Sequence, residues 1–284
     1  MRKSFITLIS ALILASVVFS QDTGKVRADK LWESEKVFQI PESVFYDHQN
    51  KVLYVSNING NPTVEDENGF ISRVGLDGKV IDLQWVQGLN APKGMGKIGN
   101  VLYVTDITRL IEIDIPTGRI LHIHDVEGAK FLNDITTDPQ GYVYISDMQA
   151  GVIYRYDGKS IENWMEGEIL VSPNGLYLKD NVLYIGCTDR IIKVDTKTGD
   201  HKISFEGTGS IDGLNVDMHG NYIISNWRGL VQFIQPPDLK IILFNTSDKL
   251  VNAADIFFAP STGILYVPTF ADGRVMAYKI VYNE

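Results

Sequence analysis

The sequence predicts an all-β chain folded as a six-bladed β-propeller, and a sequence repeat carries this prediction. A short segment that begins a strand recurs six times, and each copy is followed about a dozen residues later by an apolar strand ending in a small polar residue. The recurring position falls at residues 42, 93, 133, 174, 212 and 254, so the spacings are 51, 40, 41, 38 and 42 residues. A period near 40 residues is typical of a four-stranded propeller blade.

The order of strands within one repeat supports the same fold. Repeat four reads as strands at 174–178, 182–187, 190–195 and 201–205, with turn residues between them and no helical periodicity. Turn dipeptides and tripeptides recur in the other repeats at Asp77-Gly78, Pro116-Thr117-Gly118, Asp157-Gly158 and Thr262-Gly263. This regular punctuation favours short antiparallel strands throughout.

The two ends of the chain are expected to complete one blade together. The sixth repeat ends one strand short, after residues 273–280, and residues 31–38 form an unassigned strand before repeat one. We expect this N-terminal strand to complete the last blade, which removes an open sheet edge. Residues 21–284 are therefore predicted to form one propeller domain. The longest insertion, residues 57–69, is either a lid over one mouth of the propeller or a solvated hairpin.

Residues 1–20 have the pattern of a signal peptide. Arg2 and Lys3 precede a fifteen-residue apolar run, which stops before Gln21. The alternative, an uncleaved membrane anchor, is disfavoured because the run is short. The mature chain is thus expected to be periplasmic or secreted, with no membrane span after cleavage.

The overall charge and the cysteine count exclude some classes of function. The formal net charge of −9 becomes more negative when Arg2 and Lys3 are removed, and no basic cluster stands out, so nucleic acid is not expected as a partner. Cys187 is the only cysteine and lies in an apolar strand, which predicts a packed thiol. The oligomeric state is left open.

The recurring position carries metal-competent side chains. In a propeller the first strand of each blade lines the central channel, so Glu42, Lys93, Asn133, Asn174 and Asp212 are expected to face one another at one mouth. Two carboxylates and two carboxamides are oxygen donors of the kind that Ca²⁺ prefers, although another divalent cation also fits. A structural zinc site is disfavoured because no Cys/His cluster exists.

Taken one at a time, these residues have a local explanation. Asn174-Gly175 and Asp212-Gly213 are ordinary turn dipeptides, and Asn133-Asp134 is suited to capping its own loop. Their shared position in a closed ring favours the metal interpretation, because desolvated polar groups in a narrow channel need a cation or water.

These motifs resemble a known family. The sequences around Glu42, Asn133-Asp134, 173–176 and 211–214 are similar, in this order, to those of the SMP-30/gluconolactonase/luciferin-regenerating-enzyme-like family, which is related to diisopropyl fluorophosphatases and paraoxonases. The resemblance covers nearly all of the mature chain. It implies a six-bladed propeller with a catalytic divalent metal, usually calcium, at the channel mouth, and hydrolysis of sugar lactones, esters or organophosphates.

Specific residues match the motifs of that family. Glu42, Asn174 and Asp212 match its metal ligands, and Asn133 matches a residue that contacts metal or substrate. A bound cation can polarise an acyl or phosphoryl oxygen, and Asp212 then serves as either base or nucleophile. Asp134 and Asp255 are expected to orient the ligands. Trp227 is a further candidate for substrate binding.

The chain also departs from the family pattern. The usual Glu-Gly-Pro is Glu42-Ser43-Val44, and Phe131 stands where gluconolactonases carry an arginine, so a sugar lactone loses an expected anchor. Lys93 occupies a paraoxonase histidine position. Its ammonium either orients substrate or acts as a base, making it a candidate catalytic residue, or else it repels or replaces the metal.

The sequence therefore predicts a calcium-dependent lactonase or esterase acting on a small molecule. The alternative is a non-enzymatic propeller that binds a small molecule or a protein partner, because the same fold hosts both classes. The five histidines lie in predicted turns or outer strands and are weak candidates for any role at the site: His48, His122, His124, His201 and His219.

Overall fold

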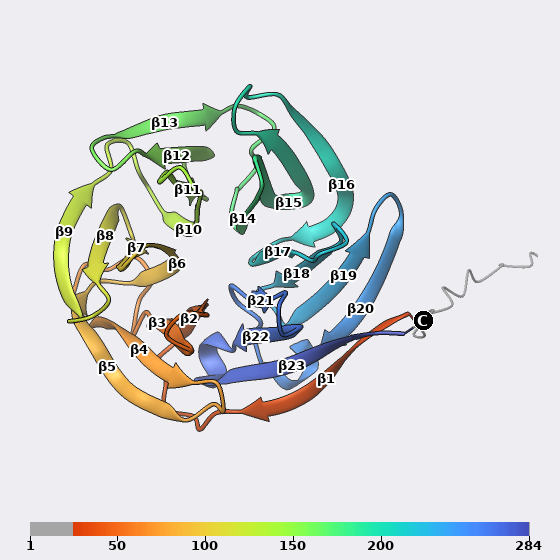
Figure 1. Cartoon of the computed structure of the whole chain (residues 1–284), viewed down its shortest axis with the longest axis horizontal. Helices are drawn as coiled ribbons and strands as arrows, with labels where there is room; N and C mark the ends of the chain where they lie inside the picture. Colours follow the sequence, from red (N-terminus) through yellow and green to blue (C-terminus); the bar gives the residue numbers. More distant parts are fainter. Residues whose placement is uncertain (1–24, 284) are drawn as a thin grey trace, which may run out of the picture.

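The computed structural model describes residues 25–283 and is a six-bladed β-propeller. Figure 1 shows six antiparallel sheets arranged around a central channel, with the first strand of each blade innermost. These innermost strands are β2 (Pro41–Asp47), β6 (Pro92–Ile98), β10 (Leu132–Thr137), β14 (Leu176–Lys179), β17 (Leu214–Val216) and β21 (Phe257–Ala259). The predicted fold class is confirmed. The predicted signal peptide, residues 1–20, lies outside the described residues.

Each blade proceeds outward from its innermost strand. Blades one and two continue with β3 (Val52–Asn57), β4 (Gly69–Gly75) and β5 (Val80–Leu89), and with β7 (Val101–Asp106), β8 (Arg109–Asp114) and β9 (Arg119–Asp125). Blades three and four continue with β11 (Val143–Asp147), β12 (Val152–Tyr156) and β13 (Ile161–Glu166), and with β15 (Val182–Asp195) and β16 (His201–Ser210). Blades five and six continue with β18 (Tyr222–Asn226), β19 (Leu230–Gln235) and β20 (Leu239–Asn245), and with β22 (Ile264–Pro268) and β23 (Val275–Tyr282).

Blade four differs in one respect from its predicted strands. The second and third predicted strands, 182–187 and 190–195, are parts of one continuous element, β15. Its first half pairs with β14 and its second half with β16. Asp189 lies between the halves and has a φ of 62°, so the chain changes direction there. The residues on either side of it are in strand conformation.

The ring is closed by β1 (Val26–Glu33), which pairs antiparallel with β23 as the outer strand of the last blade. The prediction of N-terminal closure is confirmed, but its bounds of 31–38 were wrong. Ser34 ends the ladder, because its N–H donates to Val275 O and its Oγ accepts from Val275 N. The chain then crosses to the rim, where Phe38 is buried and its N–H donates to Gly273 O.

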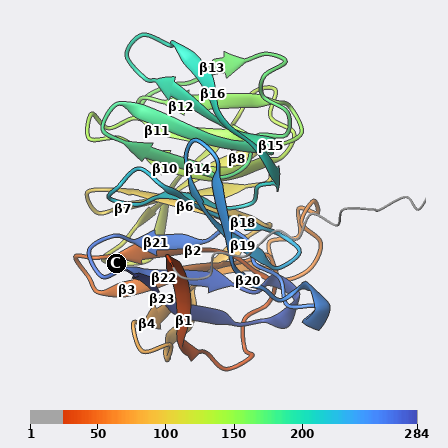
Figure 2. The same cartoon turned by 90° about the vertical axis from the view of Figure 1, so that its right-hand side faces the viewer.

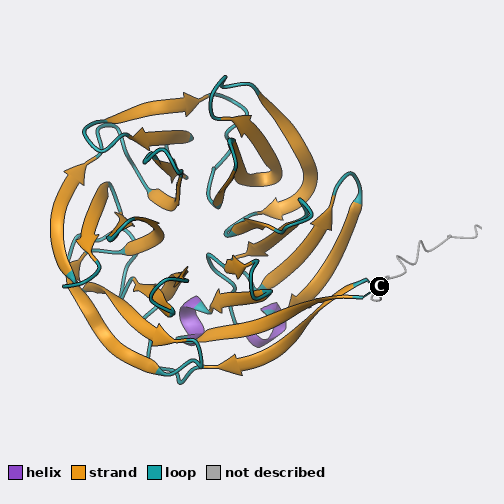
Figure 3. Ribbon diagram, viewed as in Figure 1, coloured by secondary structure: helices purple, strands orange, loops and turns teal. Residues whose placement is uncertain are grey.

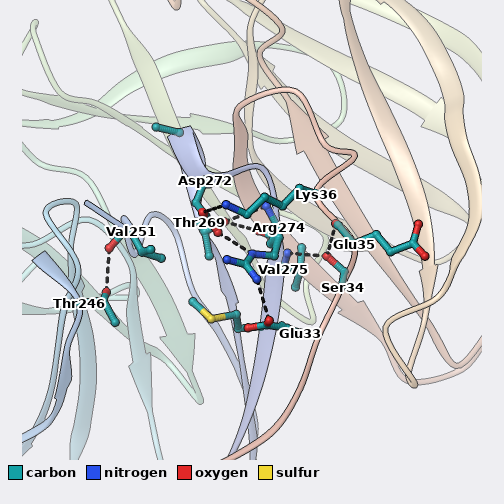
Figure 4. A network of polar contacts seen from close by, with 12 residues as sticks. Glu33, Ser34, Glu35, Lys36, Thr246, Val251, Thr269, Asp272, Arg274 and Val275 are labelled. Atoms are coloured by element: carbon teal, nitrogen blue, oxygen red, sulfur yellow. Dashed lines mark hydrogen bonds and ion pairs between the residues drawn. The ribbon is translucent and has the colours of Figure 1, made fainter. Parts of the chain in front are cut away.

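Ion pairs strengthen this closure (Figure 4). Arg274 Nη1 lies 2.7 Å from Glu33 Oε1, and Arg274 Nε lies 2.6 Å from Asp272 Oδ2. Lys36 Nζ lies 2.6 Å from the other oxygen of Asp272. The segment after β1 is thereby tied to the loop that follows β22.

The hydrophobic core is divided into six layers, one between each pair of neighbouring blades. The layer between blades two and three, for example, joins Tyr103 and Leu110 to Ile135, Val143 and Ile145. Similar clusters fill the other five interfaces, including the one between the last blade and the first. Cys187 belongs to the layer between blades three and four and is fully buried, as predicted.

Irregular structure is sparse. Figure 3 shows two short helical turns in the described chain, η1 (Ser247–Lys249) and η2 (Phe270–Asp272). The side view in Figure 2 places β13 and β16 at the opposite end of the disc from β1 and β4. Within residues 25–283, the structure contains no helix of the length and hydropathy that a membrane crossing requires.

Candidate metal and active site

The structure brings the five polar side chains of the repeated position together. Glu42, Lys93, Asn133, Asn174 and Asp212 all line one pocket of about 730 Å³, and each is between 1% and 7% exposed. They are called here the channel mouth. The residue in the sixth blade, at position 254, is an alanine and adds no polar group. Asn174 Nδ2 donates to Asp212 Oδ1 at 2.9 Å, which links two blades directly.

An irregularity in each first strand places these residues. In blades one to three the pairing register shifts around Glu42, Lys93 and Asn133, as in a β-bulge. In blades four and five the strands begin only after Asn174 and Asp212. The irregular backbone turns these side chains into the channel. In a regular strand, successive side chains would instead point to opposite faces of the sheet.

Glycines allow the first strands to meet closely below the mouth. A Cβ on Gly94 would lie 2.5 Å from Asp134 Cα, one on Gly175 would lie 2.5 Å from Asp212 O, and one on Gly213 would lie 2.4 Å from Ile256 N. None of the three has a positive φ. The explanation of Asn174-Gly175 and Asp212-Gly213 as turn dipeptides is therefore wrong, because these glycines serve interblade contact.

The polar residues that end the second strands fix the backbone segments that lead into the first strands. Asp106 accepts from the N–H groups of Asn90 and Ala91, and Asp147 accepts from those of Lys130 and Phe131. Each carboxylate thus fixes the backbone two or three residues before Lys93 or Asn133. In blades two and three, the small polar residue noted in the sequence repeat has this positioning role.

Three oxygens at the channel mouth have no partner. Glu42 Oε2, Asn133 Oδ1 and Asn174 Oδ1 are buried and form no hydrogen bond, and they are the only such side-chain oxygens in the described chain. Buried polar atoms are normally satisfied, since an unpaired one costs about 1 to 3 kcal/mol. Oxygens from three blades that face one pocket without a donor fit the ligand set of a hard cation.

The charges at the site are unbalanced. Burial, together with the nearby Asp212, raises the pKa of Glu42 well above its ordinary value. Burial raises the pKa of Asp212 to about 7, although the Asn174 hydrogen bond opposes this shift. Burial also raises the pKa of Asp134 to about 7 and strongly raises that of Asp255. The buried carboxyl groups at and below the mouth outnumber the buried ammonium of Lys93, so a cation would relieve the repulsion among them.

Lys93 is held away from the carboxylates. Its Nζ donates to Ala91 O at 2.9 Å and to Pro62 O at 3.4 Å, and it lies 4.4 Å from the ring centre of Phe131. In the described chain it forms no ion pair with Glu42. Burial lowers the pKa of Lys93 to about 8, against the opposing effect of Glu42 and Asp106. The ammonium thus leaves the orphan oxygen of Glu42 unpaired.

Asp134 and Asp255 contact the backbone and side chains beside the proposed ligands. Asp134 Oδ2 accepts from Leu176 N at 2.6 Å, two residues after Asn174. Asp255 accepts from Ser43 Oγ at 2.5 Å, and its N–H donates to Glu42 O at 2.9 Å. Each carboxyl therefore fixes a neighbouring blade at the position of a candidate ligand.

The pocket walls follow a second repeated position that the sequence analysis did not use. The residue directly after the end motif of each second strand is called here the exit position. The six exit residues are Ile58, Ile107, Met148, Thr188, Trp227 and Phe270. All but Ile107 line the pocket, and five of the six are large and apolar. The exit position could have been found in the sequence, because each exit residue directly follows the small polar residue that ends the motif of its repeat.

The remaining pocket residues include one that sequence reasoning missed. Arg228 follows Trp227 in the turn after β18 and lines the same pocket. Pro62 also lines it, so the insertion of residues 57–69 reaches the mouth and forms part of the wall. No histidine is among the lining residues.

The oxygen set depends on carboxamides as well as carboxylates. Between residues 25 and 283 no three His, Cys, Asp or Glu side chains are grouped in a way that could hold a metal ion. The candidate set at the mouth has two carboxylates, Glu42 and Asp212, completed by Asn133 and Asn174. Among protein metals, Ca²⁺ suits such a mixed oxygen set best.

The protein is thus a β-propeller whose first strands place carboxylates and carboxamides at one channel mouth. Comparison with known proteins identifies its family. Residues 40–270 match the model of the SMP-30/gluconolactonase/LRE-like region. The chain belongs to this family. A search of curated proteins gave no significant match.

Solved structures share the fold at low sequence identity. A gluconolactonase from Xanthomonas campestris superposes with a TM-score of 0.64 at 15% identity, over 92% of this chain and 91% of that one. An inactive variant of virginiamycin B lyase from Staphylococcus aureus, with quinupristin, has a TM-score of 0.63 at 12% identity, over 90% and 99% of the two chains. A streptogramin B lyase gives 0.64 at 12% identity, over 90% and 97%. These likenesses concern the fold alone.

Proposed function

We propose that the protein is an exported, calcium-dependent hydrolase of lactones or related esters. The observation that carries this proposal is the set of three buried, unpartnered oxygens at the channel mouth, Glu42 Oε2, Asn133 Oδ1 and Asn174 Oδ1, beside the carboxylate of Asp212. Membership of the gluconolactonase-like family supports the reaction class. Export rests on the sequence of residues 1–20 alone.

The reaction adds water across the acyl C–O bond. The oxygen of water bonds to the acyl carbon, the ring or alcohol oxygen leaves and takes a proton, and the product is a hydroxy acid or an acid and an alcohol. Calcium bound by Glu42, Asn133, Asn174 and Asp212 would polarise the acyl oxygen and lower the barrier to this addition.

The residues of this chain supply the other requirements. Asn174 Nδ2 holds one oxygen of Asp212, which leaves the second oxygen available as a base toward water or as a nucleophile toward the acyl carbon. Lys93, held by Ala91 O and Pro62 O at the pocket wall, faces the developing negative charge of the substrate. The apolar exit residues exclude water around the bound substrate.

The first prediction tests this assignment through Asp212. The change Asp212→Asn keeps the shape of the side chain but removes its charge and basicity, so kcat for lactones and aryl esters should fall by at least about 100-fold. Initial rates at saturating calcium measure this, with Asp125→Asn on the exposed face of β9 as a control of equal charge change. Wild-type enzyme that hydrolyses no lactone, ester or phosphotriester in calcium would favour the non-enzymatic binding protein instead.

A further inference from the structure

The pocket above the channel mouth has an apolar part to its wall, beside the polar side chains of Ser172, Thr188, Ser210 and Asn226. Ile58 is 1% exposed and Phe131 is 8% exposed, and Met148 and Phe270 are half-buried beside them. Trp227 lines the same pocket and is 47% exposed. A substrate that fills about 730 Å³ against such walls buries apolar surface.

Two of these aromatic residues are fixed as a unit. The rings of Trp227 and Phe270 meet edge to face, with centres 5.4 Å apart and an interplanar angle of 77°. Asn252 joins their backbones, because its Nδ2 donates to Trp227 O at 2.9 Å and its Oδ1 accepts from Ala271 N at 3.3 Å. The pair therefore offers a preorganised apolar surface at the rim, which lowers the entropic cost of binding.

The pocket would carry a positive charge once it held a divalent cation, whereas the protein as a whole is acidic. The ionisable lining residues are Glu42, Asp212, Lys93 and Arg228. Once a divalent cation matches the two carboxylates, the two basic side chains remain, although the whole chain carries a net charge of −9. Arg228 is exposed at the rim, and in the described chain its guanidinium forms no ion pair or hydrogen bond. Its backbone is held by a bond from Arg228 N to Asn226 Oδ1 at 3.1 Å.

Arg228 and the candidate metal ligands belong to the same rigid region. Asp212 N donates to Ser225 O at 2.9 Å. The turn that carries Arg228 begins two residues after Ser225, at the end of β18. A substrate whose acyl group sits at the mouth can therefore extend along Trp227 toward Arg228. A guanidinium binds a carboxylate through two parallel hydrogen bonds, a geometry that a neutral hydroxyl group does not match.

We propose that this pocket selects lactones or esters with an apolar, ring-sized body that bears an anionic group, with Trp227 and Phe270 packing the body and Arg228 binding the anion. The proposal rests on the proposed function, because it places the acyl group at the metal-binding mouth. Phe131 adds a further apolar side chain to the same pocket wall.

The second prediction tests this selectivity with three lactones. The probes are 3,4-dihydrocoumarin, the same compound with a carboxylate on its aromatic ring, and glucono-1,5-lactone. Wild-type protein should hydrolyse the carboxylated compound with a kcat/KM about tenfold above that of the neutral one, and the sugar lactone least well. Arg228→Gln should remove this preference through KM, and Arg228→Lys should restore part of it.

A matched variant and a binding measurement complete the test. Arg119→Gln makes the same charge change on the exposed outer strand β9 and should leave the preference intact. Equal rates for the neutral and carboxylated lactones, or a preference that survives Arg228→Gln, would overturn the inference. If no lactone is hydrolysed, the proposed function fails, and calorimetric titration with the carboxylated lactone decides the inference alone. Binding that depends on Arg228 then supports it, and absent or Arg228-independent binding rejects it.

Discussion

At the scale of single residues, the channel mouth combines buried ionisable groups that lack ionic partners. Glu42 is a buried carboxylate without a hydrogen bond, and Lys93 is a buried ammonium held only by two backbone carbonyls and the Phe131 ring. The two side chains do not form an ion pair in the described chain. Such unpaired buried charges persist where function requires them, because replacing them by apolar groups would favour stability.

The third prediction concerns the pH dependence of stability through Lys93. Its pKa is lowered to about 8, so between pH 8 and about 10.5 the unfolded chain holds more protons than the folded chain, and rising pH favours folding. Lys93→Met lacks this contribution. In chelator, the Tm of wild type minus that of Lys93→Met should rise by about 4 to 7 °C between pH 7.5 and pH 9.5. A flat difference, with Lys159→Met as an exposed control, would contradict the burial of this ammonium.

The candidate site could be predicted from the sequence only where it follows the repeat. Glu42, Lys93, Asn133, Asn174 and Asp212 share one slot of the blade, so their convergence follows from the fold once the period is recognised. The direction of the Lys93 ammonium toward the carbonyls of the insertion and of its own strand does not follow, because it depends on a loop that only one blade has. Their roles as ligand, base or substrate contact stay predictions.

At the scale of secondary structure, the ends of the second strands hold the starts of the first strands. Asp147 is fully buried and accepts from four backbone N–H groups, those of Lys130, Phe131, Gln149 and Ala150. A carboxylate accepts all four, whereas a carboxamide offers only one acceptor oxygen. The position of Asn133 therefore depends on a residue that faces away from the pocket.

The fourth prediction follows for Asp147→Asn. The amide leaves at least one buried N–H unpaired or in contact with another donor, which should cost about 2 kcal/mol and lower the Tm by about 4 to 8 °C. Because Asn133 moves with this loop, calcium affinity should also fall. Thermal unfolding with and without calcium measures both effects. Asp125→Asn should change neither, and an unchanged Asp147→Asn would show that the approach to β10 is held by other contacts.

The limits of the closing strand show where an element could not be predicted. Residues 31–38 alternate partly in polarity, yet the strand spans Val26–Glu33 and ends where Ser34 caps it. Outer strands of a propeller have one solvated face and weak alternation, and β1 has one fully buried residue, Val26. Its register is set by β23 and by the ion pairs of Arg274, which are contacts between opposite ends of the chain.

At the scale of the whole molecule, the closed ring makes the site. Glu42 and Asp212 lie in blades one and five, and they share a pocket only because β1 joins the last blade to the N-terminal segment. Structures with only 12% to 15% sequence identity have a similar fold, so strand period and interblade packing determine the fold more than particular residues do. The identity of the mouth residues is thus free to vary with function.

The fifth prediction is that calcium stabilises the whole ring. An ion that binds only the folded chain adds RT ln(1 + [L]/Kd), which is about 2.7 kcal/mol at 100 times Kd, so the Tm should rise by about 5 to 10 °C in millimolar calcium. Glu42→Gln should abolish this rise.

Without calcium, the Glu42→Gln variant should be at least as stable as wild type at pH 7. The pKa of Glu42 is raised in the folded chain, so ionisation of this group above its ordinary pKa opposes folding. Differential scanning calorimetry with calcium, magnesium or chelator separates these effects. A wild-type Tm that is the same under all three conditions would remove the metal from the channel mouth, and with it the chemistry proposed for Asp212.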